Sequence, residues 1–225
     1  MSTSEERYVV TKIIEAAPLV GEPTAGPWKE AKALKVSQFP WHTAGDKQMT
    51  IVRVVYDEQA IYAQFMCEDK HIFAETTELN GPVCKDSCVE FFATIEPQKR
   101  PDYFNLEINC CGTFLLGFNG SGQNCVITPE LARRITVASS VPGPTKDESP
   151  ADNGWWVAVR LPFDVIAELS GRPVTPASGT IWGANFYRCG GKTDRQHSCW
   201  SAPKPGQFAR PAFHQPEYFG TLAFE

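Results

Sequence analysis

Short stretches of alternating hydrophobic and polar residues follow one another along most of the chain, and 17 Gly and 18 Pro residues punctuate them. A period of two is typical of β-strands that bury one face. The first two stretches flank Glu58-Gln59-Ala60 and predict a hairpin. Strands at this spacing predict an all-β, antiparallel two-sheet sandwich. The expected strands are 50–57, 61–68, 88–95, 102–109, 113–119, 134–139, 155–161, 181–188 and 218–224.

Helix signals are few and short. Thr128 precedes Pro129 and offers a capping hydroxyl, which predicts a helix start there. A second helix is expected over 162–169, which begins with proline and ends before Ser170-Gly171, and a third over 28–34. The polar, turn-rich stretch 141–154 predicts a surface loop.

The same alternation predicts which side chains form the core. Trp156, Trp182 and Phe92 are assigned to the core as well, because most large aromatic residues of a sandwich fill it. Aromatic residues beside turns differ in context and are candidates for a surface on which sugar rings stack, namely Trp28, Trp41, Trp200 and Phe213. The core residues predicted by alternation are Val52, Val54, Phe65, Val89, Phe91, Leu106, Ile108, Val157, Val159 and Phe186.

Composition excludes several classes of protein. The 225 residues fit one domain spanning 1–225, and a net charge of −5 argues against a nucleic-acid partner. No apolar stretch approaches the length of a membrane span, which predicts no membrane partner. The N-terminus lacks the features of a secretory signal, so we expect a cytoplasmic protein, or an extracellular one if an export segment is missing from the sequence.

The eight cysteines are expected to be mostly free thiols, given the length of the chain and the missing secretory signal. Cys84 and Cys88 lack the second pair of ligands that tetrahedral zinc requires. A disulfide between Cys189 and Cys199 across a hairpin stays open.

Motifs for catalysis are absent: the chain has no nucleophile elbow, no zinc-protease helix motif and no phosphate loop. The remaining possibility for catalysis is a pair of carboxylates for glycoside hydrolysis, in which Glu90 or Glu107 acts with another acid. We expect no catalytic residue, with a xylanase-like glycoside hydrolase as the alternative.

Five motifs occur in a characteristic order and together resemble a carbohydrate-binding module family 9-like domain of the DOMON-like superfamily. The resemblance covers about 56–224 and implies an immunoglobulin-like β-sandwich that binds carbohydrate, here the end of an oligosaccharide or polysaccharide. Such domains are often attached to xylanases and other glycoside hydrolases. The motifs are Asp86-Ser-Cys-Val-Glu-Phe-Phe92, Tyr103-Phe-Asn-Leu-Glu-Ile-Asn109, Trp156-Val-Ala-Val-Arg-Leu-Pro-Phe163, Trp182-Gly-Ala-Asn-Phe-Tyr-Arg188 and His214-Gln-Pro-Glu-Tyr-Phe-Gly220.

The resemblance also implies a set of binding residues. Of the family's two tryptophans that sandwich a sugar, the first falls at Val83 or Cys84, which are not aromatic, and the second aligns with Phe213. We expect an exposed Phe213 ring to stack on the sugar above a sheet face that carries the other binding residues. Arg188 is expected to pair with Glu90. The predicted carbohydrate-binding residues are Glu90, Asn105, Tyr187, Arg188 and Phe213.

Structural calcium is a further implication, since some members of the family hold it. No cofactor is required by any motif, but Asp57, Asp69 and Asp86 lie in or beside turns where carboxylates could converge on calcium. The alternative is that they are solvated turn acids. A haem-binding relative is another alternative and needs an axial pair of Met66 with one histidine: His42, His71, His197 or His214.

Overall fold

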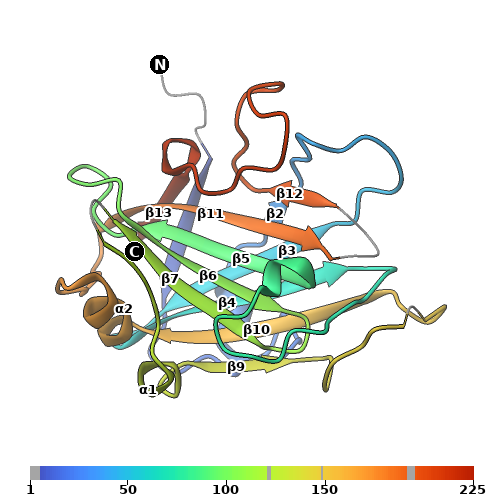
Figure 1. Ribbon diagram of the computed structural model, residues 1–225. Coiled ribbons are helices and arrows are strands. Elements are labelled where there is room, and N and C mark those ends of the chain that lie inside the picture. The colour runs from blue at the N-terminus through green and yellow to red at the C-terminus, as the bar shows by residue number, and fades with distance from the viewer. Residues whose placement is uncertain (1–5, 121–122, 148, 192–195) are drawn as a thin grey trace.

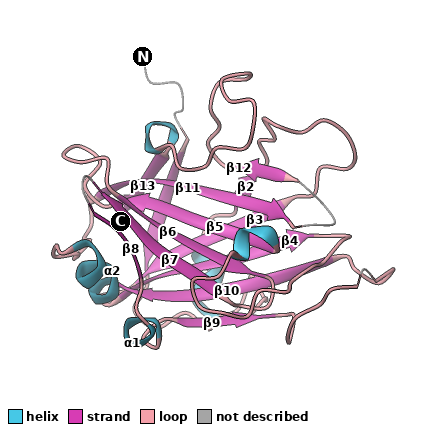
Figure 2. Cartoon of the chain, viewed as in Figure 1, coloured by secondary structure: helices cyan, strands magenta, loops and turns pink. Residues whose placement is uncertain are grey.

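Strands are the main regular secondary structure of the computed structural model, which describes residues 6–120, 123–147, 149–191 and 196–225 (Figures 1 and 2). They form two sheets that share strand β1 and enclose one large hydrophobic cluster. The predicted all-β sandwich is therefore confirmed. No helix of the described part is both long enough and apolar enough to cross a membrane.

The first sheet, called sheet A, carries the residues that matter most for function. Its order is β8-β7-β6-β5-β11-β13-β1, and β12 pairs with the end of β11. The bounds are β1 (Arg7–Lys12), β5 (Ser87–Thr94), β6 (Tyr103–Asn109), β7 (Phe114–Gly120), β8 (Gln123–Val126), β11 (Ile181–Gly190), β12 (His197–Cys199) and β13 (Gly220–Phe224).

The second sheet, called sheet B, runs β1-β3-β4-β10-β9, with β2 paired to β3. β1 passes from one sheet to the other and pairs in parallel with both β13 and β3, so the expectation of a purely antiparallel fold is wrong at this strand. The new bounds are β2 (Leu34–Val36), β3 (Thr50–Tyr56), β4 (Ala60–Glu68), β9 (Thr136–Ser139) and β10 (Gly154–Pro162).

All nine expected strands are present, and β1, β2, β8 and β12 were not expected. Three of these four are only 3 or 4 residues long. So few residues show too little alternation to stand out from a loop.

The short helices form where their capping residues indicate. Thr128 caps α1 (Pro129–Ala132) by accepting a hydrogen bond from the Leu131 backbone N–H. The second helix, α2 (Phe163–Ser170), ends at Gly171, whose φ of 66° is left-handed. In place of the third helix there is a shorter 3₁₀ turn, η1 (Gly26–Glu30). Two more 3₁₀ turns are η2 (Val83–Lys85) and η3 (Pro216–Tyr218).

All ten core residues predicted by alternation are buried. Three tryptophans differ from the prediction. Trp28 and Trp200 are buried, so neither forms an aromatic surface. Trp156 was expected in the core but is half-exposed, because Trp155 occupies the inward-facing position of β10.

Candidate functional site

The face of sheet A that points away from the main core, called outer face A, collects the polar residues. Its side chains alternate along each strand with core residues, so Glu90, Asn105 and Tyr187 share this face as predicted. Tyr187 lies opposite Glu90 across β11 and β5, and Glu90 lies opposite Glu107 across β5 and β6. One row across three strands therefore holds two facing carboxyl groups.

The Glu90–Glu107 pair is buried, with only 3% and 6% of the two residues exposed. Side chains directly opposite each other in a sheet have Cβ atoms about 4.5–5.5 Å apart. Burial raises the pKa of the Glu90 carboxyl well above its ordinary value, and the neighbouring Glu107 raises it further. Burial also raises the pKa of Glu107, and a hydrogen bond from Asn105 partly offsets that rise. The pair therefore keeps a proton to a higher pH than exposed carboxyl groups do.

A chain of amides links this pair to the surface. Asn119 on β7 donates from Nδ2 to Asn105 Oδ1 at 2.7 Å, and Asn105 donates from Nδ2 to Glu107 Oε1 at 2.8 Å. Gly117 lies opposite Asn105, and a Cβ atom at position 117 would approach Asn105 Oδ1 to 2.6 Å. The hydrogen bonds between these amides therefore require glycine at this position. Asn119 is half-exposed and gives the chain an end at the surface.

Aromatic rings cover the other end of the row. Phe213 stacks on Tyr187 with ring centroids 4.2 Å apart and planes 14° apart, and the Tyr187 hydroxyl donates to the Phe213 carbonyl. The Trp41 ring packs against Phe213 at 5.8 Å. Only 8% of Phe213 is exposed, so the prediction of an exposed stacking ring is wrong. The half-exposed Trp41 is the outermost ring of this stack.

Two long loops hold these rings in place. The loops that precede β3 and follow β12 rise beside each other above the β12 end of the molecule (Figure 1), and Trp41 Nε1 donates to the Phe208 carbonyl across them. The residue after Phe213, His214, packs on Phe92 and lies 2.9 Å from the Tyr103 hydroxyl through Nδ1. Burial lowers the pKa of His214. Phe213 and His214 therefore roof the middle of outer face A.

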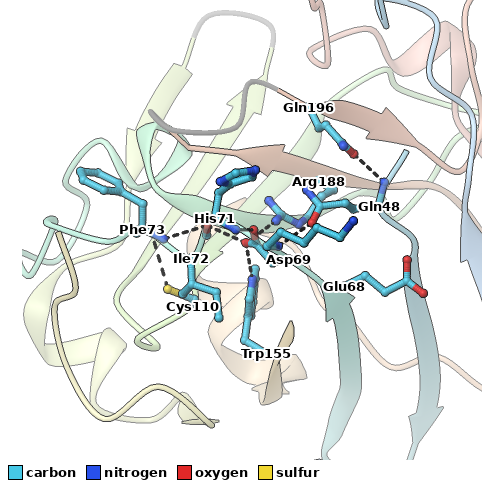
Figure 3. A network of polar contacts seen from close by, with 12 residues as sticks. Gln48, Glu68, Asp69, His71, Ile72, Phe73, Cys110, Trp155, Arg188 and Gln196 are labelled. Carbon is cyan, nitrogen blue, oxygen red and sulfur yellow. Dashed lines mark hydrogen bonds and ion pairs between the residues drawn. The ribbon is translucent and has the colours of Figure 1, made fainter. Parts of the chain in front are cut away.

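Arg188 lies on the opposite side of sheet A, and its predicted pairing with Glu90 is wrong. Adjacent residues of a strand point to opposite faces, so Arg188 points inward where Tyr187 points outward. Its Nη2 lies 2.6 Å from Asp69 Oδ2, which also accepts from Trp155 Nε1 at 2.9 Å (Figure 3). The guanidinium lies over the Trp155 ring, 5.3 Å from its centroid.

The three aspartates predicted to hold calcium do not form one site. Asp57 lies at the β3–β4 turn and Asp69 at the other end of the same hairpin, as the register shows. Asp57 accepts from two backbone N–H groups and from the Tyr62 hydroxyl. Asp86 accepts from the backbone of Glu75 and Thr76 and from the Asn109 amide. Within the described ranges, no three His, Cys, Asp or Glu side chains group in a way that fits a metal ion.

The structure has all eight cysteines as free thiols. Cys199 lies opposite Tyr187 and not opposite Cys189, so a hairpin disulfide between the two cysteines does not match the register. Cys189 instead donates from Sγ to Glu90 Oε1 at 3.2 Å. Burial and the nearby Glu90 raise the pKa of Cys189 well above its ordinary value.

Sequence reasoning missed Asn119 and His214 as parts of the site, and it considered Glu107 only as a catalytic acid. One signal could have found Glu107. Tyr103, Asn105, Glu107 and Asn109 alternate with apolar residues and so share one strand face. The partner of Asn119 lies 14 residues away on the neighbouring strand, and that of His214 lies 111 residues away, so neither contact follows from the alternation within one strand.

Comparisons with known proteins agree with the fold. The family model for carbohydrate-binding family 9 matches residues 27–224. A solved structure of a proposed carbohydrate-binding protein from Bacteroides uniformis ATCC 8492 has 25% identity and a TM-score of 0.83, covering 99% of this chain and 100% of that chain.

Two structures of a carbohydrate-binding module family 9 protein from Caldicellulosiruptor kristjanssonii, one with glucose and one with cellotriose, share the fold. The glucose complex has 15% identity and a TM-score of 0.61, covering 98% of this chain and 96% of that one. The cellotriose complex has 14% identity and the same TM-score, covering 98% and 94%. No curated protein matches at a significant level. With a family model matched over residues 27–224 of 225, this chain belongs to carbohydrate-binding family 9 and is a carbohydrate-binding domain.

Proposed function

We propose that the chain binds the end of an oligosaccharide or polysaccharide, without catalysis, at the side of outer face A where the half-exposed Asn119 connects the buried Asn105 and Glu107 to the surface. This place is called the Glu107 edge. The observation that supports it best is the hydrogen-bond chain from the half-exposed Asn119 to the buried Glu107. A sugar hydroxyl both donates and accepts, and amide and carboxyl groups in fixed positions match this pattern.

The shape of the site favours a chain end. Phe213 and His214 roof the face over Tyr187 and Phe92, so a sugar reaches the Glu107 edge from the β7 side. A glycan bound by its middle would need to continue in both directions. Trp41 is a half-exposed ring of this face, and its flat surface suits the axial C–H groups of a further sugar unit.

The burial of Glu90 supports a noncatalytic role. Glycoside hydrolysis needs two carboxyl groups that flank the scissile bond. Glu90 and Glu107 are both buried and lie directly opposite each other on neighbouring strands, so they do not flank a bond of a sugar at the Glu107 edge. A xylanase-like activity would need that arrangement.

Calorimetric titration with glucose, cellotriose and xylotriose tests the proposal. We expect a dissociation constant on the order of 0.1–1 mM for an oligosaccharide, since one stacking ring contributes only about 0.5–1.5 kcal/mol beyond its buried area. Glu107→Gln and Asn119→Ala should each weaken binding roughly tenfold, which is typical of losing a hydrogen bond to a charged or buried partner.

Glu130→Gln is the matched control, because Glu130 is exposed in the first turn of α1. It should leave binding unchanged. The proposal fails if no sugar binds at 10-fold the expected dissociation constant, or if binding is the same in Glu107→Gln and Asn119→Ala as in the parent.

A further inference from the structure

The outward-facing side of sheet B carries a groove of about 460 Å³ that is separate from outer face A. Its floor is a row of three half-exposed apolar residues that lie opposite one another on β3, β4 and β10: Ile51, Met66 and Trp156. The volume falls within the range of about 300–1,000 Å³ found for small-molecule sites. The groove is lined by Met49, Ile51, Met66, Cys67, Glu68, Ser140, Asn153, Gly154, Trp155 and Trp156.

The Trp156 ring is held in place from one side. A Cβ at Gly21 would lie 2.4 Å from Trp156 Cδ1 and Nε1, so the Gly21 backbone packs directly against the indole. Val20 and Glu22 on either side of Gly21 accept hydrogen bonds from the buried Gln64 amide on β4, which anchors this segment to sheet B. Trp156 is therefore a fixed ring that lines the groove.

Polar groups border the apolar floor. Glu68 uses Oε2 to accept from the Met49 backbone N–H, and its carboxylate points away from the Asp69–Arg188 network (Figure 3). Asn153 is exposed, and Ser140 accepts from the Trp156 backbone N–H through its hydroxyl oxygen, which leaves its own proton to donate. The groove thus combines a flat ring with a carboxylate, an amide and a hydroxyl.

We infer that this groove is a second carbohydrate site, which takes one pyranose unit of a neutral glycan. The inference shares the ligand class of the proposed function but uses none of the residues of the Glu107 edge. The apolar C–H face of the sugar would pack on Trp156 and Met66, and its hydroxyls would bond to Glu68 and Asn153. Two sites on opposite sheets would let one domain hold two glycan chains.

The size of the groove argues against a second copy of the chain as its occupant. Ten residues line it. A stable protein interface uses about 20–30 residues on each side, so the groove is too small to support a dimer by itself.

Titration of ¹⁵N-labelled protein with cellotriose and xylotriose tests the inference, because the Trp156 indole N–H gives its own signal. We expect the Trp156 signal and the backbone signals of 66–68 and 153–156 to shift, and calorimetry to give two sites. Trp156→Ala should remove one site and leave the other. Glu68→Gln keeps an acceptor for the Met49 N–H, so it protects the fold, and it should weaken the same site severalfold.

Variants at the Glu107 edge separate this inference from the proposed function. If Glu107→Gln removes one site and the Trp156 signal still shifts, the second site stands. If Trp156→Ala and Glu68→Gln fold and both keep the full binding of the parent, the inference is wrong while the proposed function holds. If light scattering shows a dimer that Trp156→Ala converts to a monomer, the groove is an interface between copies and the inference is again wrong.

Discussion

Two groups of buried acids lie on opposite sides of sheet A and differ in the ion-pair and hydrogen-bond partners that surround them. On the core side, Asp69 meets the Arg188 guanidinium, the Trp155 indole and the Ser87 hydroxyl, so its charge is neutralised and its oxygens are hydrogen-bonded. On the outer face, Glu90 and Glu107 face each other, and they accept hydrogen bonds from the Cys189 thiol and the Asn105 amide, respectively. No lysine or arginine among the described residues forms an ion pair with either of them.

The difference separates a structural role from a binding role. A buried carboxylate that has a cation and several donors holds strands together. Buried carboxyl groups that face each other without a cation weaken the fold at neutral pH, and groups with such raised pKa values concentrate at functional sites. The comparison supports a structural role for Asp69 and Arg188 and is consistent with the binding role proposed for Glu107.

Removing half of the Asp69–Arg188 pair should have the largest effect. Asp69→Ala leaves a buried guanidinium without its carboxylate, and loss of one partner of a buried pair costs about 3–5 kcal/mol. Chemical denaturation measures the change. Asp46→Ala breaks the exposed Lys70–Asp46 pair and should cost less than about 1 kcal/mol. Equal losses in the two variants would contradict a structural role for Asp69.

Phe213→Ala should cause the next largest loss of stability. The ring is buried between Tyr187 and Trp41, and truncating a buried phenylalanine costs about 3–5 kcal/mol. Thermal unfolding measures the loss. A variant that melts within a degree or two of the parent would mean that the ring is exposed in solution.

The acid pair predicts a pH dependence of stability. The pKa values of Glu90 and Glu107 are raised in the folded state above the ordinary 4.5. The folded state therefore binds these protons more tightly, so their contribution to stability is full below about pH 4.5 and is lost as the pH rises through the raised values.

A double variant, Glu90→Gln with Glu107→Gln, should remove this dependence, because its side chains do not titrate. We expect it to melt higher than the parent at pH 8 and to show a flatter profile between pH 4 and 8. Glu130→Gln should keep the profile of the parent. A parent whose melting temperature rises steadily from pH 5 to 8 would contradict the raised pKa values.

Gly117→Ala should have the smallest effect on stability and a clear effect on binding. Its Cβ would lie 2.6 Å from Asn105 Oδ1 and displace the acceptor of the Asn119 amide. We expect a loss of about 1 kcal/mol in stability and weaker sugar binding by calorimetry. Gly143→Ala meets nothing within 4 Å of its new Cβ and serves as the control.

The sequence by itself determined nine of the 13 strands of the described residues, most of the core and the family. A period of two fixes which side of a strand each residue faces, and this local rule placed all ten predicted core residues. The same rule also excludes a shared face for Tyr187 and Arg188, which are neighbours in one strand. The prediction that both side chains lie on the binding face was therefore wrong. It came from transferring residues from the family by resemblance without applying the alternation.

Only the tertiary structure decided which polar and aromatic residues meet. Glu90 faces Glu107 because of the β5–β6 register, and Phe213 is covered because two loops far apart in the chain bring Trp41 to it. Contacts of this kind depend on strand register and loop packing, which are set by the whole fold and leave no local pattern in the sequence.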